Sequence, residues 1–143
     1  MEQTLNPAVT RLLAADALSA REASYCPYSG FAVGAAVLCE GGRIFTGCNV
    51  ESAAYSPSLC AERAAIAKAV SEGFRVFKAV AVAGGPAGET PKKFCPPCGV
   101  CRQVLREFCN ESLPVILVKT ADEVELTSLG ALFPDGFAPE DLT

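Results

Sequence analysis

Two short stretches, C-A-E-R-A-A at residues 60–65 and P-C-G-V-C-R-Q at residues 97–103, decide how this chain folds. In each stretch a thiol stands immediately before a segment whose apolar residues recur at helical spacing, so each thiol opens a predicted helix. A helix N-terminus presents unpaired N–H groups and the positive end of the helix dipole, and both stabilise a thiolate. If the two helices begin near one another, Cys60, Cys98 and Cys101 converge at one point.

The segments around these two stretches predict alternating strands and helices. A first helix begins at Asn6-Pro7, with asparagine as the cap and proline in the first turn, and continues to about residue 23. Strands are predicted at residues 31–38, 43–48, 76–83, 114–119 and 123–126. Gly73 ends the helix that follows Cys60, residues 84–97 form a long loop, and Ser128 caps a short final helix. This order predicts an α/β fold with a largely parallel or mixed sheet, a hairpin at its start and helices on both faces.

The composition restricts the chemistry that the thiols can perform. The 143 residues fit one domain, residues 1–143, and include eight Cys but no His. Without histidine, the Ser-His-Asp hydrolases, the Cys-His proteases and every His-ligated metal site are excluded. The remaining catalytic chemistry depends on thiols and carboxylates.

Charge and hydropathy bear on the partners and the location of the protein. Twelve Lys and Arg against 16 Asp and Glu give a net charge of −4, and the basic residues are dispersed. We therefore expect neither a nucleic-acid partner nor a membrane partner. The start M-E-Q-T-L-N-P has no secretory leader pattern, and no apolar run reaches the ~18 residues of a membrane span. We expect a cytoplasmic protein, in which clustered thiols bind metal or act in catalysis more often than they form disulfides.

The number of available thiols distinguishes a catalytic zinc site from a structural one. Three thiolates leave the fourth tetrahedral position of zinc open, as catalysis requires, whereas a structural site needs a fourth protein ligand. Cys95 is a candidate for that ligand, because Cys95, Cys98 and Cys101 are evenly spaced. The two prolines after Cys95 hold it in an extended segment before the helix, so we predict it to be a spare thiol. The other thiols, predicted to be packed in the core or partly buried, are Cys26, Cys39, Cys48 and Cys109.

A zinc ion with three thiolates carries a net charge of −1, which opposes deprotonation of a bound water. The two helix dipoles offset part of this charge. Arg63 and Arg102 each directly follow a thiol motif, and we expect both to donate hydrogen bonds to the thiolates and withdraw charge. Glu62 can accept a proton from the water if the entry angle of its helix brings the carboxylate to the open position.

A C-x-x-C pair at a helix start also has a redox interpretation. Both C-P-P-C and C-G-V-C in this chain fit the thioredoxin-like motif, and the pair alone does not separate that reading from metal binding. A second predicted helix that opens with C-A-E favours zinc.

Five segments together resemble the cytidine deaminase family, in its short, homotetrameric, zinc-dependent form. They are Y-C-P-Y-S-G-F-A-V-G-A-A at 25–36, G-C-N-V-E at 47–51, the C-A-E and C-x-x-C stretches, and F-A-P-E-D-L at 137–142. The resemblance implies a three-layer α/β/α sandwich with a mixed five-stranded sheet. It also implies hydrolysis of cytidine and deoxycytidine to uridine and deoxyuridine with release of ammonia, in pyrimidine salvage.

The resemblance assigns roles to the residues of the two motifs. It makes Cys60, Cys98 and Cys101 the ligands of one zinc ion per chain, in the all-cysteine version of the zinc deaminase site. It implies that zinc-bound hydroxide adds to C4 of the pyrimidine while Glu62 shuttles protons to N3 and to the leaving amine. The backbone N–H of Ala61 is implied to bind the base.

Five further positions match substrate-binding residues of the family. Asn49 and Glu51 match the pair that binds the ribose, and Phe31 matches an aromatic residue that packs on the base. Tyr55 matches an interface residue near the sugar, and Phe137 matches an aromatic residue that reaches a neighbouring subunit's site. Without the resemblance, Asn49 fits a turn, Glu51 a solvated loop, and Phe31 and Phe137 ordinary core or lid positions.

Other functions share parts of this pattern. A deaminase of another cytosine nucleoside, such as an aminoacyl-nucleoside antibiotic, would use the same metal site, although Asn49 and Glu51 favour a free ribose. A nucleic-acid-editing deaminase would need a basic groove, which the acidic balance disfavours. A non-catalytic zinc-stabilised or redox module would need the thiols but not Glu62.

Overall fold

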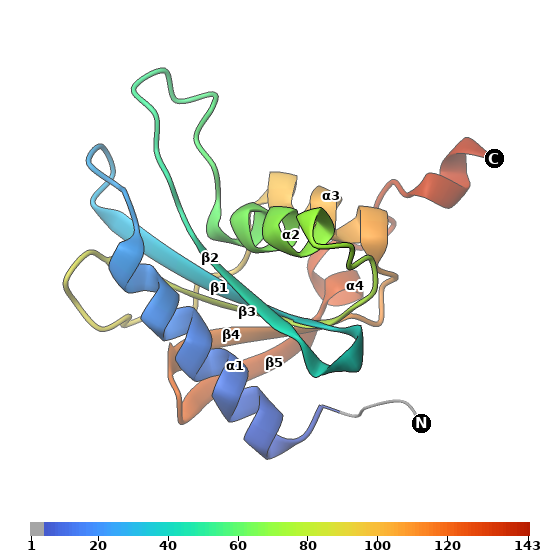
Figure 1. Ribbon diagram of the computed structural model, residues 1–143, viewed down its shortest axis with the longest axis horizontal. Coiled ribbons are helices and arrows are strands. Elements are labelled where there is room, and N and C mark those ends of the chain that lie inside the picture. The colour runs from blue at the N-terminus through green and yellow to red at the C-terminus, as the bar shows by residue number, and fades with distance from the viewer. Residues whose placement is uncertain (1–4) are drawn as a thin grey trace.

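The computed structural model describes residues 5–143 and shows a central sheet with helices on both faces (Figure 1). In chain order the elements are α1 Pro7–Ala20, η1 Arg21–Ala23, β1 Phe31–Cys39, η2 Glu40–Gly42, β2 Ile44–Cys48, α2 Ala61–Ser71, β3 Phe77–Pro86, α3 Gly99–Phe108, β4 Pro114–Thr120, β5 Glu123–Ser128, α4 Leu129–Leu132 and η3 Pro139–Leu142. None of the helices in this part of the chain has the length and apolarity that crossing a membrane requires. Residues 1–4, on which the expected absence of a leader partly rests, lie outside the described part.

The first helix has the capping that its sequence predicts. The Asn6 side chain accepts a hydrogen bond from the backbone N–H of Val9 at 2.8 Å, and Pro7 is the first helical residue. This cap satisfies one of the N–H groups that a helix start leaves unpaired. The 3-10 turn η1 continues the helical segment to Ala23, where the sequence predicts that it ends.

The sheet is mixed and five-stranded, in the order β2-β1-β3-β4-β5. Strand β1 is antiparallel to both β2 and β3, and β4 is antiparallel to β5. Within residues 5–143 the pair β3 and β4 alone is parallel, because α3 returns the chain beside the strand it has just left. The expected three-layer architecture is confirmed, and of the two predicted kinds of sheet the mixed one is present.

Strand β3 is longer than its sequence predicts. Gly84 and Gly85 have the composition of a loop, but they pair with Val33 and Ala32 of β1, so the strand continues to Pro86. A Cβ atom at Gly84 would lie 2.7 Å from the Cys95 sulfur, and one at Gly85 would lie 3.1 Å from Pro91. These two glycines leave room for the segment that leads to α3 to pack on the strand.

Two apolar cores lie on opposite faces of the sheet. Helix α1 packs on one face, where its Leu13 and Ala17 contact alanines of the strands, including Ala81. Helices α2 and α3 cover the other face, where Ile66 and Leu105 join a larger cluster of Val, Leu and Phe side chains. The sheet therefore holds α2 and α3 side by side, as Figure 1 also shows.

Gly47 on β2 lets the start of α2 approach the sheet closely. A Cβ atom at this position would lie 2.5 Å from the Ala61 carbonyl oxygen and 2.6 Å from the Ala65 nitrogen, both of which belong to the helix backbone. Backbone cannot move aside as a side-chain tip can, so glycine is required here. The position of Cys60, directly before α2, depends on this contact.

Replacing Gly47 therefore tests how the sheet positions the helix. We predict that Gly47→Ala lowers the free energy of unfolding by about 1–3 kcal/mol, the usual cost of overpacking, and reduces the zinc content of the purified protein. Urea denaturation and elemental analysis measure the two effects. Gly99→Ala is the control, because a Cβ there meets nothing within 4 Å although Gly99 lies between two of the thiols. Equal stability and zinc content in both variants would contradict this account.

Candidate active site

Two helices on the same face of the sheet begin at thiols. Cys60 is the N-cap residue of α2, and Cys98 is the N-cap residue of α3. Neither side chain makes a capping hydrogen bond to its helix, so both sulfur atoms remain free for other partners. The first-turn N–H groups and the helix dipoles favour negative charge at this point.

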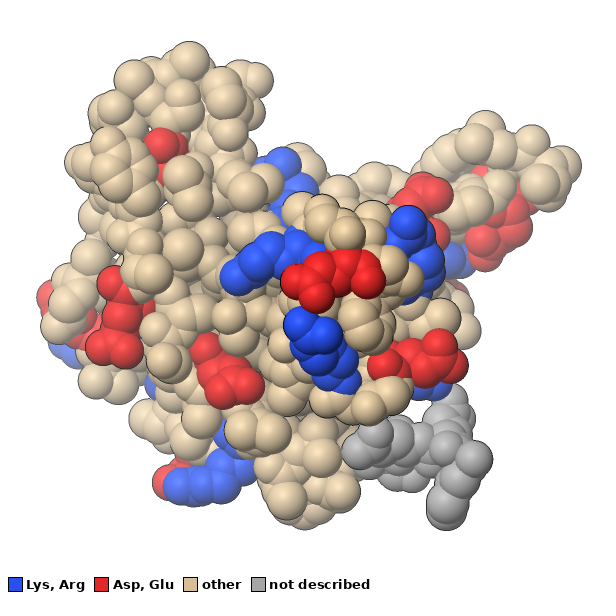
Figure 2. Space-filling view, viewed as in Figure 1, with Lys and Arg blue, Asp and Glu red and all other residues tan. Residues whose placement is uncertain are grey.

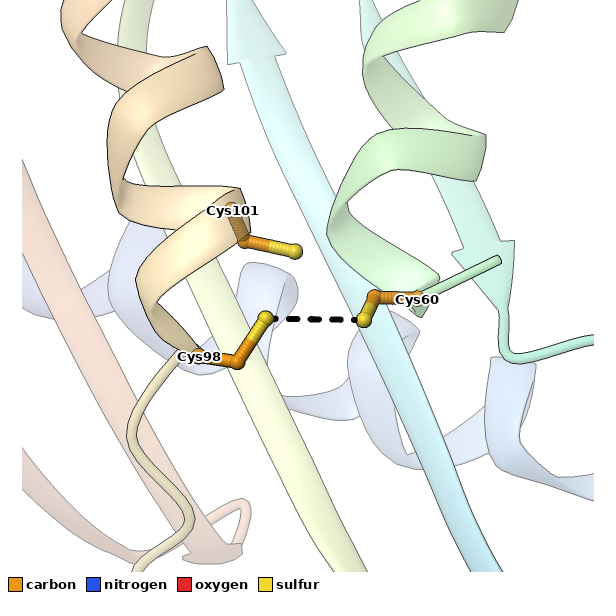
Figure 3. A group of neighbouring side chains, drawn as sticks. All are labelled: Cys60, Cys98 and Cys101. Carbon is orange, nitrogen blue, oxygen red and sulfur yellow. Dashed lines mark hydrogen bonds between the residues drawn. The ribbon is translucent and has the colours of Figure 1, made fainter. Parts of the chain in front are cut away.

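The three thiols meet between these helix ends, as Figure 3 shows. The Sγ atoms of Cys60, Cys98 and Cys101 all lie within 4.8 Å of one another, and those of Cys60 and Cys98 are 3.6 Å apart. Tetrahedral zinc with Zn–S bonds of ~2.3 Å places its sulfur ligands about 3.8 Å apart. The cluster therefore fits zinc, with three protein ligands.

Hydrogen bonding and a nearby cation favour thiolate at Cys60 in this cluster. A hydrogen bond with Cys101, assisted by the guanidinium of Arg63, lowers the pKa of Cys60 to about 5 although the thiol is partly buried. The same hydrogen bond, together with burial, raises the pKa of Cys101, so this contact favours the thiolate at Cys60 and the thiol at Cys101. Arg63 lies with its Nη2 atom 3.5 Å from the Cys60 sulfur and 3.4 Å from the Ser58 carbonyl oxygen.

Glu62 combines charge and burial in an unusual way. Its side chain is 3% exposed, and it is the one buried charged residue in the described part of the chain. Burial raises the pKa of its carboxyl group to about 7, and the neighbouring Cys60 thiolate adds to the increase. A carboxyl group with a pKa near neutral pH can both accept and donate a proton, as a general acid and base must.

A pocket of about 200 Å³ opens beside the thiol cluster. Its lining includes six residues that the sequence assigns to the site: Asn49, Glu51, Cys60, Ala61, Glu62 and Cys98. Cys101 is fully buried at the cluster. The structure thus brings the thiols, the buried carboxylate and two polar side chains of a distant loop around one cavity.

A sequence model described as "Cytidine and deoxycytidylate deaminase zinc-binding region" matches residues 9–117, which include all three clustered thiols. The chain belongs to this family. The match describes a zinc-binding region, and together with the sulfur geometry it suggests zinc as the metal.

Individual relatives agree with the family assignment. A cytidine deaminase of Sporosarcina psychrophila is 50% identical over 131 residues, covering 92% of this chain and 93% of that protein. The crystal structure of a cytidine deaminase from Burkholderia pseudomallei matches this one with a TM-score of 0.79 and 44% sequence identity. The match covers 88% of this chain and 97% of that one. A cytidine deaminase structure from Mycobacterium tuberculosis is 41% identical with a TM-score of 0.74, covering 88% of this chain and 94% of that one. The deaminase fold is therefore shared along most of the chain.

Asn49 is largely occupied by backbone contacts in this deaminase fold. Its Oδ1 atom accepts hydrogen bonds from the N–H of Val33 at 2.9 Å and from the Ser24 hydroxyl, and its Nδ2 atom donates to the Phe31 carbonyl at 2.9 Å. One amide proton remains for a ligand. These partners lie 16 to 25 residues away, so the Asn49 side chain joins distant segments and does not form the local turn that the sequence alone suggests.

Glu51 binds the loop that leads into β1, at Tyr28 and Ser29. Its carboxylate accepts hydrogen bonds from the N–H groups of Tyr28 at 3.0 Å and Ser29 at 3.1 Å, and from the Ser29 hydroxyl. The hydrogen bonds from Ser29 are the main reason that the pKa of Glu51 is lowered. A carboxylate has about four acceptor positions, so Glu51 keeps capacity for a ligand hydroxyl.

The three aromatic residues assigned to the site do not line this pocket. Phe31 is 40% exposed and lines an adjacent cavity. Tyr55, 71% exposed, has a positive φ of 61° and packs edge-on against Tyr28 with the ring centroids 6.1 Å apart. Phe137 is exposed on the C-terminal segment, which extends away from the sheet in Figure 1 and whose Phe137 carbonyl accepts a hydrogen bond from Gln103 at 2.8 Å.

Sequence reasoning did not assign five other residues that line the pocket. They are Val33, Ser58, Leu59, Cys95 and Pro96. Four of them lie one to three residues before a predicted zinc ligand along the chain, and this proximity could have identified them. Val33 could not be found in this way, because it reaches the pocket only through the position of β1 beneath α2.

The expected charge-withdrawing role of Arg102 is wrong. Its Nε atom donates to the Pro97 carbonyl at 2.7 Å, and its Nη1 atom donates to the Leu132 carbonyl of α4. The guanidinium is directed toward backbone oxygens because Arg102 lies on the side of α3 that faces α4. Arg102 therefore connects the start of α3 to α4 and does not contact a thiolate.

The prediction for the remaining thiols is confirmed. Cys39 and Cys109 are buried, and Cys26 and Cys48 are partly buried.

The contrast between Cys95 and Cys98 tests the ligand set. We predict that Cys98→Ala loses most of its zinc, whereas Cys95→Ala, which removes a thiol three residues away, retains about one zinc per chain. Mass spectrometry under non-denaturing conditions measures the bound metal, and circular dichroism establishes that both variants fold. Loss of zinc from Cys95→Ala, or full retention in Cys98→Ala, would require a different ligand set.

Proposed function

We propose that this protein hydrolyses cytidine and deoxycytidine to uridine and deoxyuridine and releases ammonia. The observation that carries the proposal is the burial of Glu62 in the pocket that the thiol cluster borders. A zinc-stabilised module without catalysis would gain nothing from a buried carboxylate, which is costly to desolvate. Cytidine deaminases that are 40–50% identical to this chain support the substrate.

Cys60, Cys98 and Cys101 would hold one zinc ion per chain. Bound there, zinc supplies a Lewis acid that lowers the pKa of a water molecule to near neutral. Because three thiolates leave the metal centre with a net negative charge, the surroundings must favour loss of the proton. Arg63, 3.5 Å from the Cys60 sulfur, and the two helix N-termini provide positive potential for this purpose.

Glu62 would carry the protons of the reaction. Its carboxylate takes a proton from the attacking water and passes it to N3 of the pyrimidine, which makes C4 more electrophilic. After the oxygen of the water has bonded to C4, Glu62 transfers the remaining proton of that water to the exocyclic amine. The C4–N bond then breaks, ammonia leaves, and the carbonyl of uridine remains.

The remaining site residues would orient the nucleoside. The N–H of Ala61, at the start of α2, binds the base, and Asn49 and Glu51 bind the ribose hydroxyls with the hydrogen-bonding capacity that the loop contacts leave free. Phe31, at the edge of the adjacent cavity, packs on the base.

The site would be completed in a homotetramer. The pocket of about 200 Å³ is smaller than the ~300–1,000 Å³ of typical ligand sites, so one chain does not enclose a nucleoside. Tyr55 and Phe137 are exposed aromatic side chains outside this pocket, and we infer that they contribute to neighbouring subunits' sites.

On the face shown in Figure 2, basic and acidic residues are interspersed, which does not favour a nucleic-acid strand as the substrate. We infer a role in pyrimidine salvage in the cytoplasm, where free nucleosides are available.

A direct assay tests the proposed reaction. We predict that the purified protein converts both cytidine and deoxycytidine with release of ammonia, that a zinc chelator abolishes turnover, and that added zinc restores it. The decrease in absorbance on deamination and an ammonia assay measure the reaction. Protein that contains one zinc per chain but converts neither nucleoside would rule out this function.

Substitution of Glu62 tests the identity of the proton carrier. We predict that Glu62→Gln lowers kcat at least ~100-fold, the usual contribution of general acid–base catalysis, while the zinc content and the fold are retained. Glu72→Gln, which removes an exposed carboxylate at the other end of α2, is the matched control. Full activity in Glu62→Gln would assign the base to another residue.

A further inference from the structure

A second cavity lies next to the proposed base pocket. It has a volume of about 440 Å³, and its walls are mostly apolar, with Phe31, Gly84 and Phe94, although Lys92 and Lys93 also line it. Cys95 and Pro96 line both cavities. These two residues therefore stand between the pocket that contains Glu62 and a second, mostly apolar space.

The Cys95 side chain is fixed in this position by the strand beneath it. A Cβ atom at Gly84 of β3 would lie 2.7 Å from the Cys95 sulfur and 3.0 Å from Cε2 of Phe31. The thiol and the ring thus rest directly on the glycine backbone. A longer side chain at position 95 cannot extend toward β3 and must instead enter one of the two cavities.

Cys95 also has the chemical character of an apolar wall. Burial raises the pKa of its thiol to about 11, so the group is neutral at physiological pH. Its sulfur makes a long polar contact, 3.8 Å from the Pro96 carbonyl oxygen. A neutral thiol behaves as a small hydrophobic group and suits contact with the edge of an aromatic base.

Under the proposed function, on which this inference rests, one edge of the base must meet this wall. The ribose on N1 is bound through Asn49 and Glu51, and the O2 and N3 edge faces Ala61 and Glu62. C4 faces the thiol cluster. The C5 edge is left with the remaining wall, and within that wall Cys95 and Pro96 are the residues that also line the second cavity.

We propose that Cys95 is a specificity-determining residue: its side chain separates the base pocket from the second cavity and limits the size of the substituent accepted at C5. The substrates concerned are cytosine nucleosides that carry an apolar group at this position. Shortening the side chain joins the two cavities and admits a larger group. Lengthening the side chain narrows the pocket at the C5 edge.

The test compares 5-iodocytidine with cytidine in Cys95→Ala and Cys95→Leu. We expect the ratio of kcat/KM for 5-iodocytidine to that for cytidine to rise about tenfold in Cys95→Ala and to fall about tenfold in Cys95→Leu, in the range that one methylene group contributes to specificity. The change is expected mainly in KM, because the residue contacts the substituent and not the reacting atoms. Using a ratio cancels any general loss of activity or folded protein.

Cys26→Ala is the control, because Cys26 is another half-buried thiol but lines neither cavity. Its ratio is expected to equal that of the unmodified protein. Ratios within twofold of that value in both Cys95 variants, with cytidine still converted, overturn the inference and leave the proposed function standing. Failure of the unmodified protein to convert cytidine overturns the proposed function, and with it the inference.

Discussion

The convergence of two helix N-termini is the constraint on which the rest of the site depends. Three sulfur atoms within 4.8 Å of one another concentrate negative charge once they ionise, and like charges at such distances repel strongly. The sheet holds α2 and α3 in place from below, through Gly47 and the larger apolar core, so the thiols stay together despite this repulsion. The helix dipoles and Arg63 reduce the electrostatic cost, and a divalent cation removes most of it.

Glu62 connects this electrostatic arrangement to chemistry. A carboxylate buried beside thiolates is unfavourable in its charged form, which is why its pKa is raised to about 7. A protein without any histidine needs another group that can exchange protons near neutral pH, and burial gives Glu62 this property. Cys95 lines the same pocket as Glu62. The proposed proton carrier and the proposed specificity-determining residue therefore lie around one cavity.

Local signals predicted much of the structure, and tertiary contacts account for the rest. The Asn6 cap, the two thiols that open helices and the capping Ser128 depend on neighbours within a few residues, and the sequence shows these directly. Gly84 resembled a loop residue because the packing that requires glycine comes from Cys95 and Phe31, far away in the sequence. Arg102 was misassigned for a similar reason, since its carbonyl partner in α4 lies 30 residues away. The pairing of Asn49 and Glu51 with residues 24–31 was equally invisible until the fold was known.

A catalytic zinc ion in the thiol cluster would keep one coordination position open, whereas a structural zinc ion would be closed by a fourth protein ligand. X-ray absorption spectroscopy at the zinc edge of the purified protein distinguishes the two. We expect three sulfur neighbours at ~2.3 Å and one oxygen neighbour at ~2.0 Å, with the oxygen signal changing when a nucleoside is added. Four sulfur neighbours, which would make Cys95 or another thiol a ligand, would contradict this expectation.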